Sequence, residues 1–146
     1  MAEVAARAAA AGAAPSPMAE FASCGIAVDE VGAGADPRAV ACVATAGLDL
    51  RSHTTRQADA AMLAAADRIY ALDQSVLAHL RERASADVAP RIALLTSLIP
   101  DAGVIDIDDP YRGTAADYEA AFALIRRAAD ALAQSLPSAP RATRLT

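Results

Sequence analysis

Few side chains of this chain are of the types that commonly carry out chemistry. It has two cysteines, Cys24 and Cys42, and two histidines. Two thiols do not make a disulfide framework, and Cys42 falls in a helical stretch, which predicts a core position. No cluster of Cys, His, Asp and Glu has the spacing of a metal site. The densest polar group is DIDDPY, residues 106–111, whose Asp109 taken alone is typical of a loop residue that caps a turn before proline.

Composition limits the class of protein that these residues belong to. The chain has 146 residues, 55% of them hydrophobic, which is enough for one domain with one core. Its net charge is −5, without a block of like charge, so the sequence argues against a nucleic-acid surface. It holds no run of about 18 strongly apolar residues that would span a membrane. The alanine-rich start carries Glu3 and Arg7 and does not fit a signal peptide, so we expect a cytoplasmic protein.

The first half of the chain predicts two helices and one strand. Residues 2–12 are mostly alanine, which has the highest helix propensity. The short apolar run 21–25 indicates a buried strand. Asp36 followed by Pro37 is typical of a helix start, and that helix should run to about Ala46 and close at Gly47.

The second half alternates further helix and strand candidates. Thr114, with Asp117 three residues later, resembles a capping box that opens a long last helix. The alternation predicts an α/β domain with a parallel sheet over residues 1–136, followed by a disordered tail from Pro137. The expected elements are a helix at 59–66, a strand at 68–72, a helix at about 75–83 after Asp73, a strand at 92–95, and a helix at about 115–135.

Three stretches in order resemble low-molecular-weight protein tyrosine phosphatases. Residues 23–25 (SCG) followed by 35–39 (ADPRA) are similar to the family's S-A-G-T and A-D-P-R-A. Residues 47–57 (GLDLRSHTTRQ) are similar to G-I-D-L-S-x-H-x-A-R-Q, and residues 106–111 are similar to the D-x-x-D-P-Y of the acid loop. The resemblance covers roughly residues 1–135. It implies a three-layer α/β/α fold with a small parallel sheet.

The resemblance also implies an activity. Family members hydrolyse phosphomonoesters by passing the phosphate to a cysteine and then to water, which needs no metal and no organic cofactor. The partners would be phosphorylated proteins or small aryl phosphates, and nothing in the sequence indicates an oligomeric state. Protein arginine phosphatases and thiol-based arsenate reductases are relatives on the same fold. Asp73 resembles the tyrosine branch, whereas residues 113–118 look more like the arginine branch.

Four residues take roles from this resemblance. Asp109 matches the general acid that protonates the leaving oxygen. Tyr111 matches the wall of the substrate pocket, although a tyrosine at the core edge fits the sequence nearly as well, and Arg112 stands where the family often has a second aromatic residue. Ser23 and His53 match positions that brace the phosphate loop through hydrogen bonds, with a surface position on a helix flank as the alternative for His53.

The phosphate-binding loop itself is not in this sequence. In the family, C-x5-R supplies a thiolate that attacks phosphorus, while backbone amides and the arginine hold the phosphate oxygens. Six residues after Cys24 stands Glu30, and six after Cys42 stands Leu48. Cys24 occupies a position where the family usually has alanine, which predicts a small buried residue.

The start of the chain fits the family in two registers. In one, residues 16–20 (SPMAE) are the S-P-M-A-E that follows the loop, which leaves no room for the first helix. In the other, residues 1–3 (MAE) take that place, the helix fits residues 2–12, and the next strand begins at Phe21. We favour the second register. The loop and the first, central strand would then precede Met1, either because the start codon was assigned too late or because of a real truncation. A truncated remnant kept as a non-catalytic binding module is the rival hypothesis.

Overall fold

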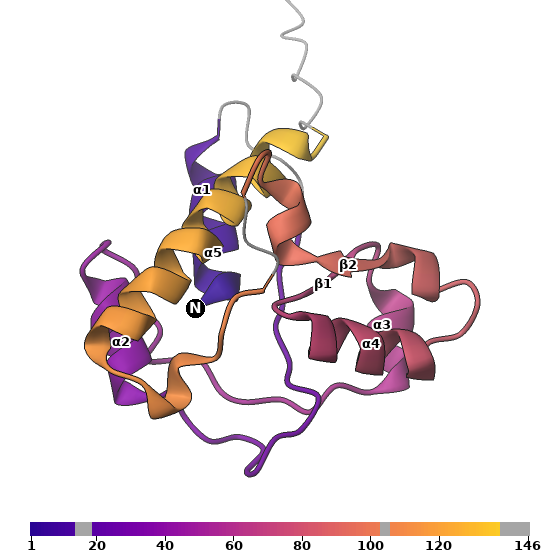
Figure 1. Ribbon diagram of the computed structural model, residues 1–146, viewed down its shortest axis with the longest axis horizontal. Helices are drawn as coiled ribbons and strands as arrows, with labels where there is room; N and C mark the ends of the chain where they lie inside the picture. The colour runs from indigo at the N-terminus through magenta and orange to yellow at the C-terminus, as the bar shows by residue number, and fades with distance from the viewer. Residues whose placement is uncertain (14–18, 103–105, 138–146) are drawn as a thin grey trace, which may run out of the picture.

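The first helix ties the N-terminal end of the chain to its C-terminal end. In the computed structural model, which describes residues 1–13, 19–102 and 106–137, α1 runs over Ala2–Gly12 and α5 over Ala115–Ser135. The two helices lie side by side (Figure 1). Their small alanine side chains allow this close approach, and Ala5, Ala128 and Ala129 are buried in the contact region. Both helices have the predicted bounds, and the Thr114–Asp117 capping box is present.

The sheet of the described residues is small and parallel. Strands β1 (Ile69–Ala71) and β2 (Ile92–Leu94) pair in parallel, with Tyr70 opposite Ala93. Helix α4 (Gln74–Arg83) makes the crossover between them and packs on both strands, and α3 (Ala60–Ala65) precedes β1. Figure 1 shows α3 and α4 on one side of the strands and α1, α2 and α5 on the other. The α/β class with a small parallel sheet is confirmed.

Helix α2 (Pro37–Ala44) starts and ends as the sequence predicts. The side chain of Asp36 accepts a hydrogen bond from the Arg38 amide, and Pro37 occupies the first turn. The α-helical bonds end at Ala44, and tighter turn bonds extend the coil to Ala46. Gly47 then takes φ +73°, and the Leu48 amide bonds back to the carbonyl of Val43. This is a Schellman closure, for which glycine has the required conformational freedom.

The predicted strand at 21–25 is wrong. Within the described residues this segment forms only an isolated parallel bridge, Gly25 with Gln57, through the Gly25 amide to Arg56 and the Ala58 amide to Gly25. An apolar run becomes a strand only where a neighbouring strand supplies a ladder, and residues 21–24 have no such neighbour in the described part. Cys24 is exposed, so its predicted burial is also wrong.

The core consists of two clusters on either side of the strands. The larger lies among α1, α2 and α5 and includes Val43, Leu50 and Ile125, while Cys42 is buried in it as predicted. The smaller, around Ile92 and Ala71, lies under α4. Short 3₁₀ helices that the sequence did not predict occur at Ala89–Arg91 (η1), Leu95–Leu98 (η2) and Pro110–Arg112 (η3).

Two sequence predictions remain predictions. The tail predicted to be disordered begins at Pro137, and its residues 138–146 lie outside the described ranges, so this prediction and the domain boundary at 136 stay untested. The internal SPMAE stretch also lies largely outside them. Among the residues that the structure describes, no helix is both long enough and apolar enough to cross a membrane.

Candidate active site

The two predicted bracing residues meet at one carboxylate. Ser23 Oγ donates a hydrogen bond of 2.7 Å to Glu3 Oε2, and His53 Nδ1 lies 3.8 Å from the same oxygen. Glu3 belongs to the first turn of α1, and its side chain is 10% exposed. A carboxylate at this position also interacts favourably with the positive end of the helix dipole. The Glu3 carboxylate therefore connects Ser23 and His53 to the N-terminal end of α1.

Two arginines complete this Glu3 cluster, which we define as Glu3, Arg7, Ser23, His53 and Arg56. Arg7 pairs with Glu3 Oε1 at 2.8 Å, one helical turn away, and also donates to the carbonyl of Phe21 at 2.8 Å. Arg56 lies 4.0 Å from Glu3 Oε2. A pocket of about 360 Å³ opens beside the cluster, lined in part by Glu3, Arg7 and His53. The cluster thus joins α1, the extended segment before Gly25 and the loop before α3.

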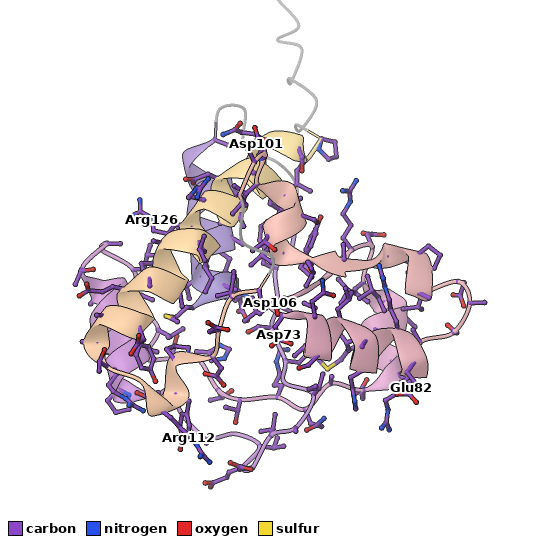
Figure 2. The ribbon with its side chains drawn as sticks, in the orientation of Figure 1. Asp73, Glu82, Asp101, Asp106, Arg112 and Arg126 are labelled. Carbon is purple, nitrogen blue, oxygen red and sulfur yellow. The ribbon has the colours of Figure 1, made fainter. Side chains whose placement is uncertain are left out.

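The acid segment, residues 106–113, is fixed at the end of β1. The Ile107 amide donates to the carbonyl of Leu72 at 2.8 Å, and Asp106 Oδ1 accepts from the amide of Gln74 at 3.0 Å. Figure 2 shows Asp106 beside Asp73, just past the carboxyl end of β1. The carboxyl ends of parallel strands are where α/β proteins usually place their chemistry. The sequence matched residues 106–111 to the family's acid loop but did not indicate these contacts to β1 and α4.

Asp109 and Tyr111 share the short helix η3. Asp109 Oδ1 accepts a hydrogen bond of 3.0 Å from the Tyr111 amide, so this residue does cap a turn before proline. Asp109 is exposed, and its other oxygen accepts no hydrogen bond from the described residues. Tyr111 is 62% exposed, which does not fit a tyrosine at the edge of the core. Arg112 follows at the outer edge of the molecule (Figure 2).

Arg38 is a residue of this region that the sequence did not single out. Its guanidinium pairs with Asp36 at 2.8 Å and contacts the backbone of the acid segment. The hydrogen bond from Arg38 lowers the pKa of Asp36 to about 2, so that carboxylate stays charged at neutral pH. The A-D-P-R-A similarity marked this stretch, but only the three-dimensional contacts show what its arginine touches.

The two groups of site residues stay separate in the described structure. Ser23 and His53 meet at Glu3, whereas Asp109 and Tyr111 meet in η3, and within the described ranges no hydrogen bond or ion pair joins the Glu3 cluster to the acid segment. Neither cysteine has the arginine six residues later that accompanies the family's loop nucleophile. Burial raises the pKa of Cys42, and although Cys24 is exposed, loss of water around its thiol raises its pKa as well. The described residues contain no group of three metal-binding side chains.

Comparison with known proteins decides the family. A family model described as low molecular weight phosphotyrosine protein phosphatase matches residues 1–141. The chain belongs to this family. A phosphatase of that name from Sus scrofa is 35% identical over 94 residues, which are 63% of this chain and 58% of the relative. The chain therefore spans less than two thirds of the length of this relative.

Bacterial phosphatases of this family give the same result. The low molecular weight protein-tyrosine-phosphatase Wzb of Salmonella typhi is 32% identical over 107 residues, 73% of this chain and 68% of the relative. The solved structure of Vibrio vulnificus Wzb in complex with benzylphosphonate has a TM-score of 0.78 and 25% identity, covering 92% of this chain and 88% of that one. The recognised family and fold are thereby confirmed. The roles of Asp109, Tyr111, Ser23 and His53 stay predictions.

We expect Glu3 to contribute to the stability of the fold, in a chain extended upstream of Met1 to include a C-x5-R loop. Glu3→Ala should lower the free energy of unfolding by about 2 kcal/mol, because it removes charge-assisted bonds and leaves Ser23 and Arg7 without their shared acceptor. Glu3→Gln should cost about half as much, since its amide oxygen still accepts from Ser23. Urea unfolding measures both. Glu82→Ala, on the exposed side of α4, is the matched control and should change little; equal effects at Glu3 and Glu82 would contradict the prediction.

Proposed function

We propose that this chain is the acid-loop and bracing part of a cytoplasmic phosphomonoesterase that acts on phosphorylated tyrosine or small aryl phosphates. One observation carries the proposal: in a chain of this family, Asp109 and Tyr111 lie in one turn that hydrogen bonds fix past the carboxyl end of β1. A carboxyl group beside an exposed aromatic ring suits the protonation of a flat leaving group. The benzylphosphonate bound to the Vibrio vulnificus relative carries an aromatic ring one CH2 group away from its phosphorus, as phenyl phosphate carries one an oxygen atom away, and agrees with this substrate class.

The reaction would proceed in two steps. A cysteine thiolate attacks phosphorus, the bond from phosphorus to the aryl oxygen breaks, and Asp109 gives its proton to that oxygen. Asp109, now a carboxylate, then takes a proton from water as the water oxygen attacks phosphorus and the sulfur–phosphorus bond breaks. The proposal requires the thiolate and the phosphate-binding arginine to come from outside these 146 residues. In the favoured register they belong directly before Met1, where the first turn of α1 begins.

Activity with and without the upstream loop tests this proposal. The 146-residue polypeptide should release no phenol from phenyl phosphate, because neither of its cysteines belongs to a C-x5-R loop. The DNA should be read in frame upstream of the Met1 codon for a strand followed by C-x5-R. A chain extended to that loop should hydrolyse phenyl phosphate and be inhibited by vanadate.

Two results would contradict the proposal. Steady, vanadate-sensitive turnover by the 146-residue polypeptide would show that its chemistry does not need the loop. An in-frame stop codon close upstream, together with binding of a phosphorylated protein without hydrolysis, would favour the non-catalytic binding module.

A further inference from the structure

Arg38 connects the start of α2 to the acid segment. Its Nη2 donates to the carbonyl of Tyr111 at 2.7 Å, and its Nη1 donates to the carbonyl of Gly113 at 3.2 Å. These partners are 73 and 75 residues away in sequence. The same guanidinium lies 5.8 Å from the centre of the Tyr111 ring and 5.1 Å from that of Tyr118 in α5. One side chain thus contacts both the backbone and the aromatic ring that follow Asp109.

The guanidinium is itself held in place before it reaches the acid segment. Arg38 Nε and Nη2 bond to the two carboxylate oxygens of Asp36 at 3.1 and 2.8 Å, and Asp36 also accepts from the Arg38 amide. Tyr118, which is buried, lies close enough to the same carboxylate that its hydroxyl helps to lower the pKa of Asp36. A planar, bidentate pair of this kind fixes the direction of the remaining N–H groups, which a lysine ammonium cannot do.

Hydrogen bonds fix the backbone of the acid segment both before and after Asp109. On one side, Ile107 and Asp106 are bonded to the end of β1 and the start of α4. On the other side, Arg38 holds the carbonyls of Tyr111 and Gly113. Gly113 is also close-packed, since a Cβ there would lie 2.6 Å from the Asp117 carboxylate. Without Arg38, the turn that carries Asp109 and Tyr111 would keep its own cap but lose its connection to α2.

We propose that Arg38 is a positioning residue for the acid step: it holds η3 so that Asp109 reaches the leaving oxygen and Tyr111 lies along the aryl ring. This inference rests on the proposed function, because it concerns the same reaction. A geometric error of about 1 Å in a proton donor is enough to cost much of its contribution to the rate. The loss should therefore depend on how much the leaving group needs the proton.

The chain offers a matched control for Arg38. Arg51 makes the same set of bonds to Asp49 two residues earlier, from its amide at 2.9 Å, Nε at 2.9 Å and Nη2 at 2.8 Å. Its guanidinium lowers the pKa of Asp49 just as Arg38 lowers that of Asp36. No hydrogen bond joins Arg51 to the acid segment within the described residues. Arg51→Ala therefore removes an equivalent ion pair without touching η3.

The experiment uses the loop-containing extended chain and two substrates, phenyl phosphate and nitrophenyl phosphate. Arg38→Ala should lower kcat/KM about tenfold for phenyl phosphate, whose leaving group needs the proton, and about twofold for nitrophenyl phosphate, since general acid catalysis contributes ~10²–10⁴-fold when fully effective. Arg38→Lys, which keeps the charge and safeguards against a folding failure, should still lose about threefold on phenyl phosphate because it lacks the fork. Arg51→Ala should leave both rates unchanged.

A double-mutant cycle separates positioning from a general structural effect. In an Asp109→Asn background, Arg38→Ala should lower kcat/KM for phenyl phosphate less than about twofold, because the proton donor that Arg38 positions is already gone. Multiplicative losses, or equal losses on the two substrates, would overturn the inference. If the extended wild-type chain is inactive, the proposed function is wrong. If it is active and Arg38→Ala leaves the dependence of its rate on the leaving group unchanged, only the role of Arg38 is overturned.

Discussion

Asp109→Asn in the extended chain should slow hydrolysis of phenyl phosphate by ~10²–10⁴-fold, the usual contribution of a general acid. The phenolate that leaves is strongly basic, so its departure without a proton is costly. Nitrophenolate is a much weaker base, and the same variant should slow nitrophenyl phosphate only mildly. The measurement is kcat/KM for a series of aryl phosphates, which reports the step that releases the leaving group and not the later hydrolysis common to all of them. Its logarithm should fall more steeply with leaving-group basicity in the variant than in the wild type.

The structure explains why asparagine is the right substitution. Asp109 Oδ1 caps η3 by accepting from the Tyr111 amide, and asparagine is as good a helix cap as aspartate. Asp109→Asn therefore keeps the turn and removes the carboxyl group that gives and takes the proton. Its free energy of unfolding should stay within about 0.5 kcal/mol of the wild type. Asp109→Ala loses the cap as well and should be both slower and less stable.

Asp108 provides the control for this prediction. It is exposed, lies one residue earlier, and is not the cap of η3. Asp108→Asn should have a much smaller effect on every substrate. If the two variants lose activity equally, or if the loss at Asp109 does not depend on the leaving group, then Asp109 is a structural residue of the loop and the acid must be sought elsewhere.

Local signals were enough to predict most of the helices. The Thr114–Asp117 box, the Asp36–Pro37 start and the glycine at position 47 each act within a few residues, and the structure contains all three. The strand at 21–25 failed because strand formation depends on a distant partner, not on the run of apolar residues itself. The same limit applies to η3, whose tight turn depends on the Asp109 cap and on contacts to α2.

The candidate site shows the same difference between features that local sequence predicts and features that depend on distant residues. Family motifs placed Asp109, Tyr111, Ser23 and His53 in the sequence, but nothing in the sequence showed that Glu3 would receive both bracing residues. Glu3 was matched to the family's M-A-E, but no role was given to its carboxylate. Arg38 looked like the second residue of another helix, and its partners lie more than 70 residues away. Contacts between residues so far apart in the sequence depend on how α1, α2 and α5 pack. The local pattern of apolar and polar residues does not predict this packing.

The second large effect concerns folding of the 146-residue polypeptide on its own. Its described sheet has two strands of three residues each, so both strands have an unpaired edge. The segment before Gly25 lies extended but makes no ladder, and its polar contacts run through Arg7 and Ser23 to α1. A sheet this narrow provides few backbone hydrogen bonds between the two core clusters. A further strand between these elements would supply both hydrogen bonds and apolar burial.

We therefore expect the 146-residue polypeptide to be molten or aggregated, and the extended chain to fold cooperatively. A domain is stable by only ~5–15 kcal/mol, which the hydrogen bonds and burial of one central strand can match. The 146-residue form should bind ANS, keep far-UV but lose near-UV circular dichroism, and melt over a broad range. The control is an extended chain whose loop cysteine is replaced by serine, which lacks the nucleophile but keeps the strand, and it should melt in one sharp transition. If the 146-residue polypeptide is instead monomeric and melts in an equally sharp transition, this expectation is wrong. Its two-stranded sheet would then be enough to keep α1 and α5 packed on the rest of the core, and the result would favour a binding module that folds on its own.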